Sequence, residues 1–175
     1  MNTASSVRVR PAVAADAAAV AQLGAATFVE TFGHLYKPED LQEFLRGSRS
    51  APYYAELIGN PRIDVRLAFL EAEPSPVGYS VAGPCKLPVT GLEASAGELR
   101  ELYVLAQYQQ HKIGSRLLNS SLEWLVAQAY SPLYVGVYSD NAGAQRLYGR
   151  HGFQKVGEYG FPVGDHIDRE FILKR

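Results

Sequence analysis

Residues 102–118 read LYVLAQYQQHKIGSRLL, and this stretch decides the fold. Its apolar start belongs to a strand-like run from Leu99 to Leu105, and the residues after its polar loop predict a helix from Ile113 to Gln128. Backbone N–H groups at a helix N-terminus, together with the helix dipole, form an anion site. Gly114 stands in the first turn, although glycine inside a helix costs about 1 kcal/mol relative to alanine, and it lets a ligand approach the backbone closely. The segment from Gln109 to Ser115 therefore predicts a phosphate-binding loop.

A second polar stretch follows the next strand. Taken alone, the segment from Gln109 to Ser115 fits an ordinary polar loop before a helix as well as it fits a phosphate-binding loop. Residues 139–153, SDNAGAQRLYGRHGF, come directly after a strand-like run from Leu133 to Tyr138. The two strands and the helix between them form a parallel unit, so both polar stretches lie at carboxyl ends of strands, where α/β sheets bind ligands. Asp140 or Asn141 caps a helix from Ala142 to Arg150. For Asn141, capping and ligand contact are both open and are compatible.

The remaining patterns predict further strands and helices around this unit. Alternating apolar residues indicate strands, and apolar residues at helical spacing indicate helices. The expected strands run over 7–10, 65–69, 77–81, 153–159 and 167–173, the expected helices over 14–28, 38–45 and 53–58, and residues 86–97 form a loop. We therefore predict a mixed α/β (α+β) fold with a central, mostly antiparallel sheet of about seven strands, one parallel pair and about four flanking helices.

The length, charge and composition of the chain limit which class of protein it can be. The chain has 175 residues, of which 47% are hydrophobic, and this fits one globular domain over 1–175. The formal net charge is -1, so no overall field favours nucleic acid or a membrane surface. No segment approaches the roughly 20 apolar residues of a membrane span, and no signal peptide is expected. Cys85 is the only cysteine, which excludes an internal disulfide and suits the cytoplasm. His34, His111, His151 and His166 lack metal-ligand spacing, so no metal is expected.

The two polar stretches together resemble the GNAT superfamily of acetyl-CoA-dependent N-acetyltransferases. The family loop has the form Gln/Arg-x-x-Gly-x-Gly/Ala, which Gln109 and Gly114 match. Lys112 takes the first Gly position and either narrows the space for a pyrophosphate or adds a cation beside it. The stretch from Asn141 to Phe153 resembles the second cofactor motif of the family at full spacing. More narrowly, residues 27–41, beginning TFVETF, are similar to bacterial spermidine/spermine N-acetyltransferases.

The resemblance implies that the parallel strands splay and that acetyl-CoA lies in the gap. Backbone groups of Leu102, Tyr103 and Val104 would bind the pantetheine arm as they would an added strand. The pyrophosphate would be held by seven loop residues: Gln109, Gln110, His111, Lys112, Ile113, Gly114 and Ser115. Asn141 would contact the cofactor from the opposite wall.

The resemblance also gives Tyr148 a catalytic role, that of donating a proton or a hydrogen bond to the departing thiolate. A phenol pKa near 10 exceeds a thiol pKa of about 8.5, so full proton transfer is uphill by roughly 2 kcal/mol. Hydrogen bonding that strengthens in the transition state is therefore the expected contribution. A core tyrosine on an apolar helix face is the alternative.

The acceptor amine creates the need for a base. A lysine-like amine with a pKa near 10.4 is neutral in about one molecule in 2,500 at pH 7, and reaching that form costs about 4.6 kcal/mol. Glu98 and Glu101 on the strand before the loop are the nearest candidates, and Glu98 falls where some family members place a catalytic glutamate. Because the two are three residues apart on a strand, we expect them on opposite faces, with at most one in the site. Either could instead be an ion-paired carboxylate, with Arg100 as partner.

The predicted function is transfer of the acetyl group of acetyl-CoA to a primary amine, a polyamine or other small amine, by direct attack in a ternary complex. An acidic wall is one interpretation of Glu30, Glu39, Asp40 and Glu43, and plain helix-dipole partners are the other. The alternatives in function are acetylation of a protein N-terminus or another small molecule, a non-catalytic acyl-CoA sensor, and a structural domain without a cofactor. Neither nucleic acid nor a membrane is expected as a partner, and a homodimer is left open.

Overall fold

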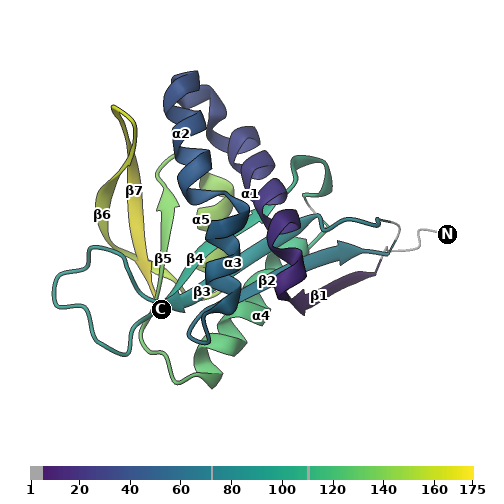
Figure 1. Cartoon of the computed structure of the whole chain (residues 1–175). Coiled ribbons are helices and arrows are strands. Elements are labelled where there is room, and N and C mark those ends of the chain that lie inside the picture. Colours follow the sequence, from purple (N-terminus) through teal and green to yellow (C-terminus); the bar gives the residue numbers. More distant parts are fainter. Residues whose placement is uncertain (1–5, 72, 110) are drawn as a thin grey trace.

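A seven-stranded sheet is the centre of the structure. A computed structural model describes residues 6–71, 73–109 and 111–175. In these residues the strands are β1 (Val7–Pro11), β2 (Asp64–Leu70), β3 (Gly78–Pro84), β4 (Gly97–Val104), β5 (Leu133–Tyr138), β6 (Gln154–Val163) and β7 (His166–Lys174). They lie in the order β1-β2-β3-β4-β5-β7-β6, and every neighbouring pair is antiparallel except β4 and β5 (Figure 1). The predicted fold, with one parallel pair in a mostly antiparallel sheet, is confirmed.

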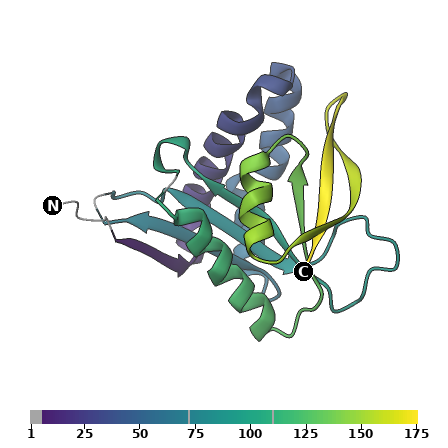
Figure 2. The ribbon, with the colours of Figure 1, turned by 180° about the vertical axis from the view of Figure 1, so that it is seen from behind.

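Helices cover both faces of this sheet. The α-helices of the described residues are α1 (Ala17–Phe32), α2 (Pro38–Ser48), α3 (Ala51–Gly59), α4 (Ile113–Ala127) and α5 (Ala142–Arg150). The first three lie over one face, and α4 and α5 lie over the other (Figures 1 and 2). Within the described ranges, the helices are too short or too polar to cross a membrane.

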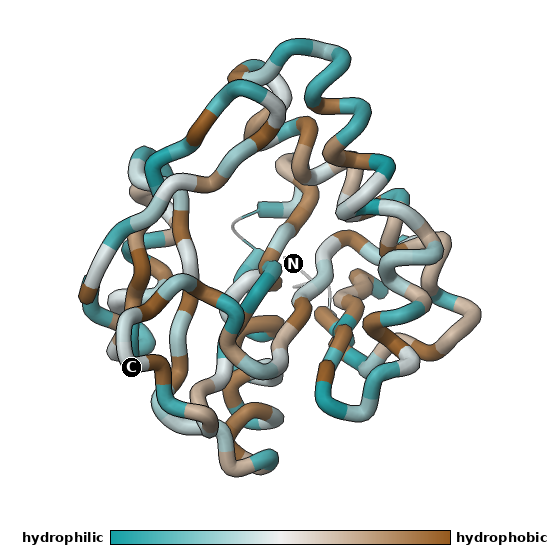
Figure 3. Tube along the Cα trace, turned by 60° about the vertical axis from the view of Figure 1, so that its left-hand side comes forward, coloured by the Kyte–Doolittle hydropathy of each residue, from teal (hydrophilic) through white to brown (hydrophobic). Residues whose placement is uncertain are grey.

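Two hydrophobic layers hold the helices to the sheet. The layer under α1 and α3 contains Val20, Leu23, Tyr54, Leu67 and Val81. The layer under α4 and α5 contains Leu99, Leu118, Leu122, Leu125 and Val135. Hydrophobic stretches run through the interior of the trace, whereas hydrophilic segments gather at its periphery (Figure 3). Burying one such side chain contributes about 1.5–3 kcal/mol, so these layers fix the strand ends that carry the polar stretches.

The parallel strands β4 and β5 separate within the sheet. Their pairing covers only Gly97 to Leu99 on β4 and Leu133 to Val135 on β5. Beyond that point β4 continues to Val104 and β5 to Tyr138 without a ladder between them. The expected splay is therefore present, and it leaves backbone groups of both strands facing a gap.

Candidate active site

A wide cavity of about 820 Å³ occupies the splay and the helix starts beside it. Ten of the residues predicted to bind a cofactor line it: Leu102, Tyr103, Val104, Gln109, Lys112, Ile113, Gly114, Ser115, Asn141 and Tyr148. His111 is exposed and is not among the lining residues, and its Nδ1 lies 3.1 Å from the carbonyl oxygen of Tyr108. Gln110 lies outside the described residues. The structure thus gathers most of the predicted residues around one cavity.

The N-terminus of α4 opens onto the wide cavity without a side-chain cap. Lys112 is the N-cap residue, its backbone is left-handed (φ 59°, ψ 14°), and its side chain caps no N–H group of the helix. A Cβ added to Gly114 would meet only Leu147 Cδ2, at 3.7 Å, which is an ordinary contact. Nothing in the described protein therefore requires glycine at Gly114, whereas a ligand close to the helix N-terminus would.

The N-terminus of α5 is closed by a side chain instead. Asn141 Oδ1 accepts a hydrogen bond from the Ala144 backbone N–H at 3.0 Å, so the residue is an N-cap. Asn141 also lines the wide cavity. Helix capping and contact with a ligand therefore both fit the position of Asn141.

Tyr148 lies where the wide cavity meets a second one. It projects from α5, is 6% exposed, and its ring packs edge-on against Phe153 with centroids 6.1 Å apart. Burial raises the pKa of its phenol well above the usual value. The phenol therefore stays protonated at neutral pH and is available as a hydrogen-bond donor.

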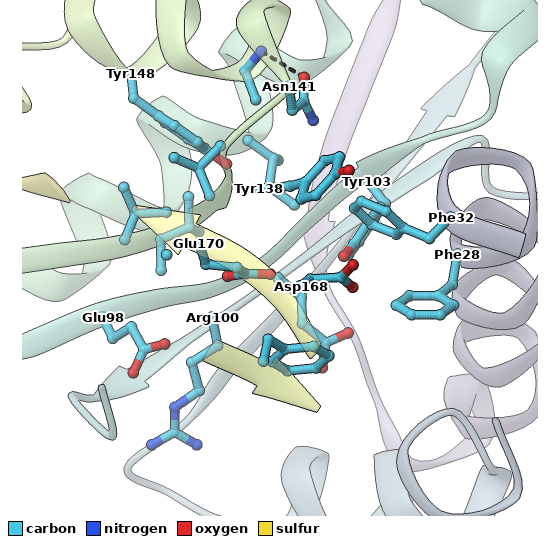
Figure 4. Close-up of a pocket in the computed structure, with 18 of the residues that line it drawn as sticks. Phe28, Phe32, Glu98, Arg100, Tyr103, Tyr138, Asn141, Tyr148, Asp168 and Glu170 are labelled. Carbon is cyan, nitrogen blue, oxygen red and sulfur yellow. Dashed lines mark hydrogen bonds between the residues drawn. The ribbon is translucent and has the colours of Figure 1, made fainter. Parts of the chain in front are cut away.

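The second, narrow cavity has a volume of about 180 Å³ and lies between α1, β4, β5 and β7. It shares seven lining residues with the wide cavity: Phe32, Leu102, Tyr103, Tyr138, Asn141, Ala144 and Tyr148. Figure 4 shows Tyr148 and Asn141 on one side of this space and carboxylate side chains on the other. The two cavities are therefore neighbouring parts of one site.

Four carboxylates and two guanidinium groups line the narrow cavity: Glu98, Glu101, Asp168, Glu170, Arg49 and Arg100. Glu101 has its partners within the protein, because Tyr54 and Tyr79 each donate to its Oε2 at 2.7 Å and Arg49 lies 3.6 Å from its Oε1. The Arg49 guanidinium is also close to the rings of Phe28, Phe44 and Tyr103. This ion pair is a structural part of the cavity wall.

Glu98 and Glu170 are the less compensated carboxylates. Glu98 Oε2 accepts one hydrogen bond from the Lys86 backbone N–H at 2.7 Å, and burial raises the pKa of Glu98. Glu170 accepts a hydrogen bond from the Tyr159 hydroxyl at 2.8 Å, and burial, together with the nearby carboxylates, raises its pKa. Among the described ion pairs, neither residue has a lysine or arginine partner. Arg100 and Lys86 act on Glu98 only at longer range, so a cationic ligand would supply a closer partner for these carboxylates.

The prediction that Glu98 and Glu101 point to opposite faces is wrong. In the β3–β4 ladder Val81 pairs with Glu101 and Ala82 with Leu99, so Arg100 is an extra residue in a β-bulge. An extra residue reverses the alternation of side chains, and both glutamates line the narrow cavity. Leu99 and Leu102 also border this cavity, but their side chains pack into the α4 layer, on the other side of the sheet from the Tyr54 and Tyr79 hydroxyls that bond to Glu101. Strand alternation alone could not reveal this bulge.

Sequence reasoning missed the contribution of β7. Asp168 and Glu170 line the narrow cavity, and with His166 they stand at every second position of one strand. That alternation was a usable signal, because polar residues with period two mark one face of a strand. Tyr36 and Arg49 carried no comparable signal, since they come from separate segments that only the fold brings together.

The interpretation of Glu30, Glu39, Asp40 and Glu43 as an acidic wall is not supported at the narrow cavity. Glu39, Asp40 and Glu43 lie on α2 and are absent from the described lining of both cavities. Glu30 lines the wide cavity, where its carboxylate accepts a hydrogen bond from the Ala106 backbone N–H at 3.0 Å. Within the described ranges, no group of three or more metal-ligating side chains occurs. Burial raises the pKa of the Cys85 thiol to about 11, so this thiol is a poor nucleophile at neutral pH.

Comparisons with known proteins agree with this geometry. The family model described as "Acetyltransferase (GNAT) family" matches residues 23–153. An uncharacterized N-acetyltransferase of Lactobacillus delbrueckii subsp. lactis is 26% identical over 154 residues, 85% of each chain. An uncharacterized N-acetyltransferase of Mycobacterium tuberculosis (strain ATCC 25618 / H37Rv) is 26% identical over 160 residues, 91% of this chain and 97% of the relative.

A solved structure is similar over nearly the whole chain. The PaiA N-acetyltransferase from Thermoplasma acidophilum, crystallised in complex with coenzyme A, superposes with a TM-score of 0.76. The two chains are 20% identical, and the match covers 97% of this chain and 98% of the other. At 20% identity this similarity shows a shared fold and nothing more specific.

Proposed function

The chain belongs to the acetyltransferase (GNAT) family and is an acetyl-CoA-dependent N-acetyltransferase, and from this premise we propose a small cationic amine as its acceptor. A polyamine or a comparable primary amine would attack directly within a ternary complex. The observation that carries the proposal is the narrow cavity, where the buried carboxylates of Glu98 and Asp168 and the partly exposed carboxylate of Glu170 lie on the side opposite Tyr148. Buried carboxylates favour a cationic ligand and disfavour an anionic one.

The wide cavity fits acetyl-CoA, which supplies the activated acetyl group. The uncapped start of α4 presents backbone N–H groups to an anion, and the open side of Gly114 leaves room for the pyrophosphate. Lys112 adds a cation at the same loop. The segment from Arg100 to Val104 on β4 has no ladder with β5, so its edge on that side offers backbone groups to the pantetheine arm.

Tyr148 is proposed to act on the leaving group. Its ring lies at the junction of the two cavities, and its raised pKa keeps the hydroxyl protonated. The same raised pKa makes complete proton transfer to a thiolate more unfavourable than for an ordinary phenol. Its contribution is therefore a hydrogen bond that strengthens as charge develops on sulfur.

Glu98 is proposed as the base that takes a proton from the amine. It is 7% exposed, it faces the narrow cavity, and its raised pKa brings it closer to neutrality, where a base is most effective. Holding the amine and the thioester in contact supplies the larger part of the rate enhancement, roughly 7 to 11 kcal/mol. Glu98 then lowers the cost of producing the neutral amine.

A thiol-release assay with acetyl-CoA tests the proposed acceptor. The panel contains spermidine, spermine, monoamines of matched chain length, amino acids and short peptides. We expect the polyamines to give the highest kcat/KM. Preference for peptides, with rates that level off by about pH 8 as an α-amine would give, would instead indicate a protein N-terminus. CoA binding without thiol release for any amine would contradict the proposal.

A further inference from the structure

The proposed reaction has to release a proton from a buried place. This inference rests on the proposed acceptor, a protonated amine. Each turnover forms one C–N bond, breaks one C–S bond and removes two protons from the nitrogen. One of these protons ends on the thiol sulfur of CoA, and the other must reach solvent. Glu98 is 7% exposed and Asp168 is 4% exposed, so a proton taken up by these carboxylates needs a way out.

Asp168 connects the narrow cavity to the surface. Its Oδ1 lies 3.0 Å from Nε2 of His166, whose side chain is 46% exposed whereas that of Asp168 is 3% exposed. The other cavity carboxylates bond to backbone or to less exposed side chains: Glu98 to Lys86 N, Glu101 to tyrosines and Arg49, and Glu170 to Tyr159. Within the described residues, Asp168 is thus the cavity carboxylate that contacts an exposed titratable side chain.

Tyr36 holds Asp168 in this position. The Tyr36 hydroxyl donates to Asp168 Oδ2, which leaves Oδ1 for His166. Burial and the Asp168 carboxylate raise the pKa of Tyr36, so the phenol remains a donor. The rings of Tyr36 and His166 meet edge to face, with centroids 5.5 Å apart. Both partners of Asp168 are therefore fixed against each other.

Glu170 links this pair to the proposed base. The negative charges of Asp168 and Glu98 both contribute to its raised pKa, so it lies within electrostatic range of each. Figure 4 shows Glu170 between Glu98 and Asp168, with the three carboxylates around one space. The three carboxylates therefore act on one another electrostatically, and, since no described hydrogen bond joins them, a proton would pass between them through water.

We propose that Asp168 and His166 form the exit for the proton that the acceptor amine releases. Asp168 takes the proton from the amine or, through water, from the neighbouring carboxylates and passes it to Nε2 of His166. His166 releases a proton from Nδ1 to solvent and regains its starting tautomer by proton exchange with water. The amine nitrogen thereby loses the proton that does not go to sulfur, and Asp168 returns to its ionised form. Tyr36 acts as a positioning residue.

Other charged side chains near His166 come from β7, from the turn before it and from α2. Asp168 lies on the same strand, and the hairpin turn before it carries Asp165, which pairs with Lys37 at 3.7 Å. From α2, the Asp40 carboxylate lies against Gly164 at the same turn. An exposed histidine in this setting can exchange protons with water while it remains bonded to a cavity carboxylate.

Chemical rescue of His166→Ala tests the exit. We expect kcat at saturating amine to fall roughly 10- to 100-fold, CoA affinity to stay the same, and imidazole added to the buffer to restore most of the rate. His34→Ala is the matched control, because His34 is exposed and absent from the described lining of both cavities, and it should show neither the loss nor the rescue. A wild-type rate in His166→Ala, or a loss that imidazole leaves unchanged, would overturn the proposal.

Asp168→Asn is the second variant in this test of the proton exit. We expect it to lower kcat at least as far as His166→Ala and to resist rescue by imidazole, since the link from cavity to surface is then missing. If this variant does not fold, His166→Ala still decides the matter, because His166 is exposed. A wild-type enzyme that acetylates no amine would refute the proposed acceptor, whereas an active enzyme insensitive to both substitutions would refute only the exit.

Discussion

The two cavities of this site are built in different ways. The wide cavity, about 820 Å³, depends on two short segments that follow β4 and β5, and it uses backbone N–H groups, a glycine and the strand edges. The narrow cavity, about 180 Å³, collects carboxylates and aromatic rings from α1, β4, β5, β7 and the loop before α2. The first suits an extended anionic ligand, and the second suits a compact cation.

This difference separates what is general in the protein from what is particular to it. A diphosphate can be held by main-chain groups, which depend on backbone shape and on few side chains. An acceptor amine has to be selected by side-chain charge and by the space between rings. We therefore expect substitutions in the wide cavity to change CoA affinity, and substitutions in the narrow cavity to change the rate and the choice of amine.

Tyr148 gives the largest expected effect, because it belongs to both cavities. Tyr148→Phe removes the hydroxyl and keeps the ring that packs on Phe153. We expect turnover to fall about 100-fold or more with little change in CoA affinity, since the hydrogen bond is made in the transition state. Thiol release and calorimetry with CoA measure the two quantities. Near-normal turnover would assign Tyr148 to the core alone.

Glu98→Gln is expected to have the next largest effect. A base must be ionised, and burial raises the pKa of Glu98, so activity should fall as the pH drops through that raised pKa. In the Gln variant this acidic limb should disappear and the rate near neutral pH should be roughly 100-fold lower, with CoA affinity retained. The pH profile of kcat/KM for the amine is the measurement. A profile unchanged by the substitution would remove Glu98 as the base and leave Asp168 or water.

Much of the wide cavity could be predicted from sequence because its determinants are local. Residues 111–115 and 141–148 each form one continuous turn and helix start, so their neighbours in sequence are their neighbours in space. The parallel strands could also be recognised, since a strand, helix and strand unit places both polar stretches at one edge.

The narrow cavity could be predicted only in part. Glu98 was identified, but its relation to Glu101 was predicted wrongly because one bulged residue, Arg100, reverses the alternation of β4. Asp168 and Glu170 reach the site because β7 lies beside β5 although it is last in the sequence. Such neighbours depend on strand order, which local periodicity does not contain. The acceptor side is therefore the part that needed a structure.

Gly114→Ala sharpens the contrast by separating stability from binding. The new methyl would make only an ordinary contact with Leu147, and alanine favours a helix over glycine, so the free energy of unfolding should rise by up to about 1 kcal/mol. The same methyl projects into the wide cavity, so CoA affinity should fall about tenfold, or about 1.4 kcal/mol. Gly47→Ala on α2, where an added Cβ meets nothing within 4 Å, should give the stability gain alone. Equal CoA affinity in both variants would show that the ligand does not approach Gly114.

Lys112→Gly gives the smallest expected effect and tests how charge supplements the main-chain site. Lys112 has a left-handed backbone, φ 59°, which costs a residue with a Cβ about 1 kcal/mol, and glycine relieves most of this. The matched control is Ala129→Gly, because Ala129 follows α4 at φ 62° and is absent from the described lining of both cavities.

Both variants should therefore be slightly more stable in denaturant titrations, but only Lys112→Gly should bind CoA more weakly. We expect a loss of a few-fold at low ionic strength that shrinks as salt is added, since an exposed cation acts through a screened interaction. Tighter binding in Lys112→Gly would mean that the side chain narrows the phosphate loop. In that case the wide cavity would depend on its main chain alone, and its contrast with the charged narrow cavity would be stronger.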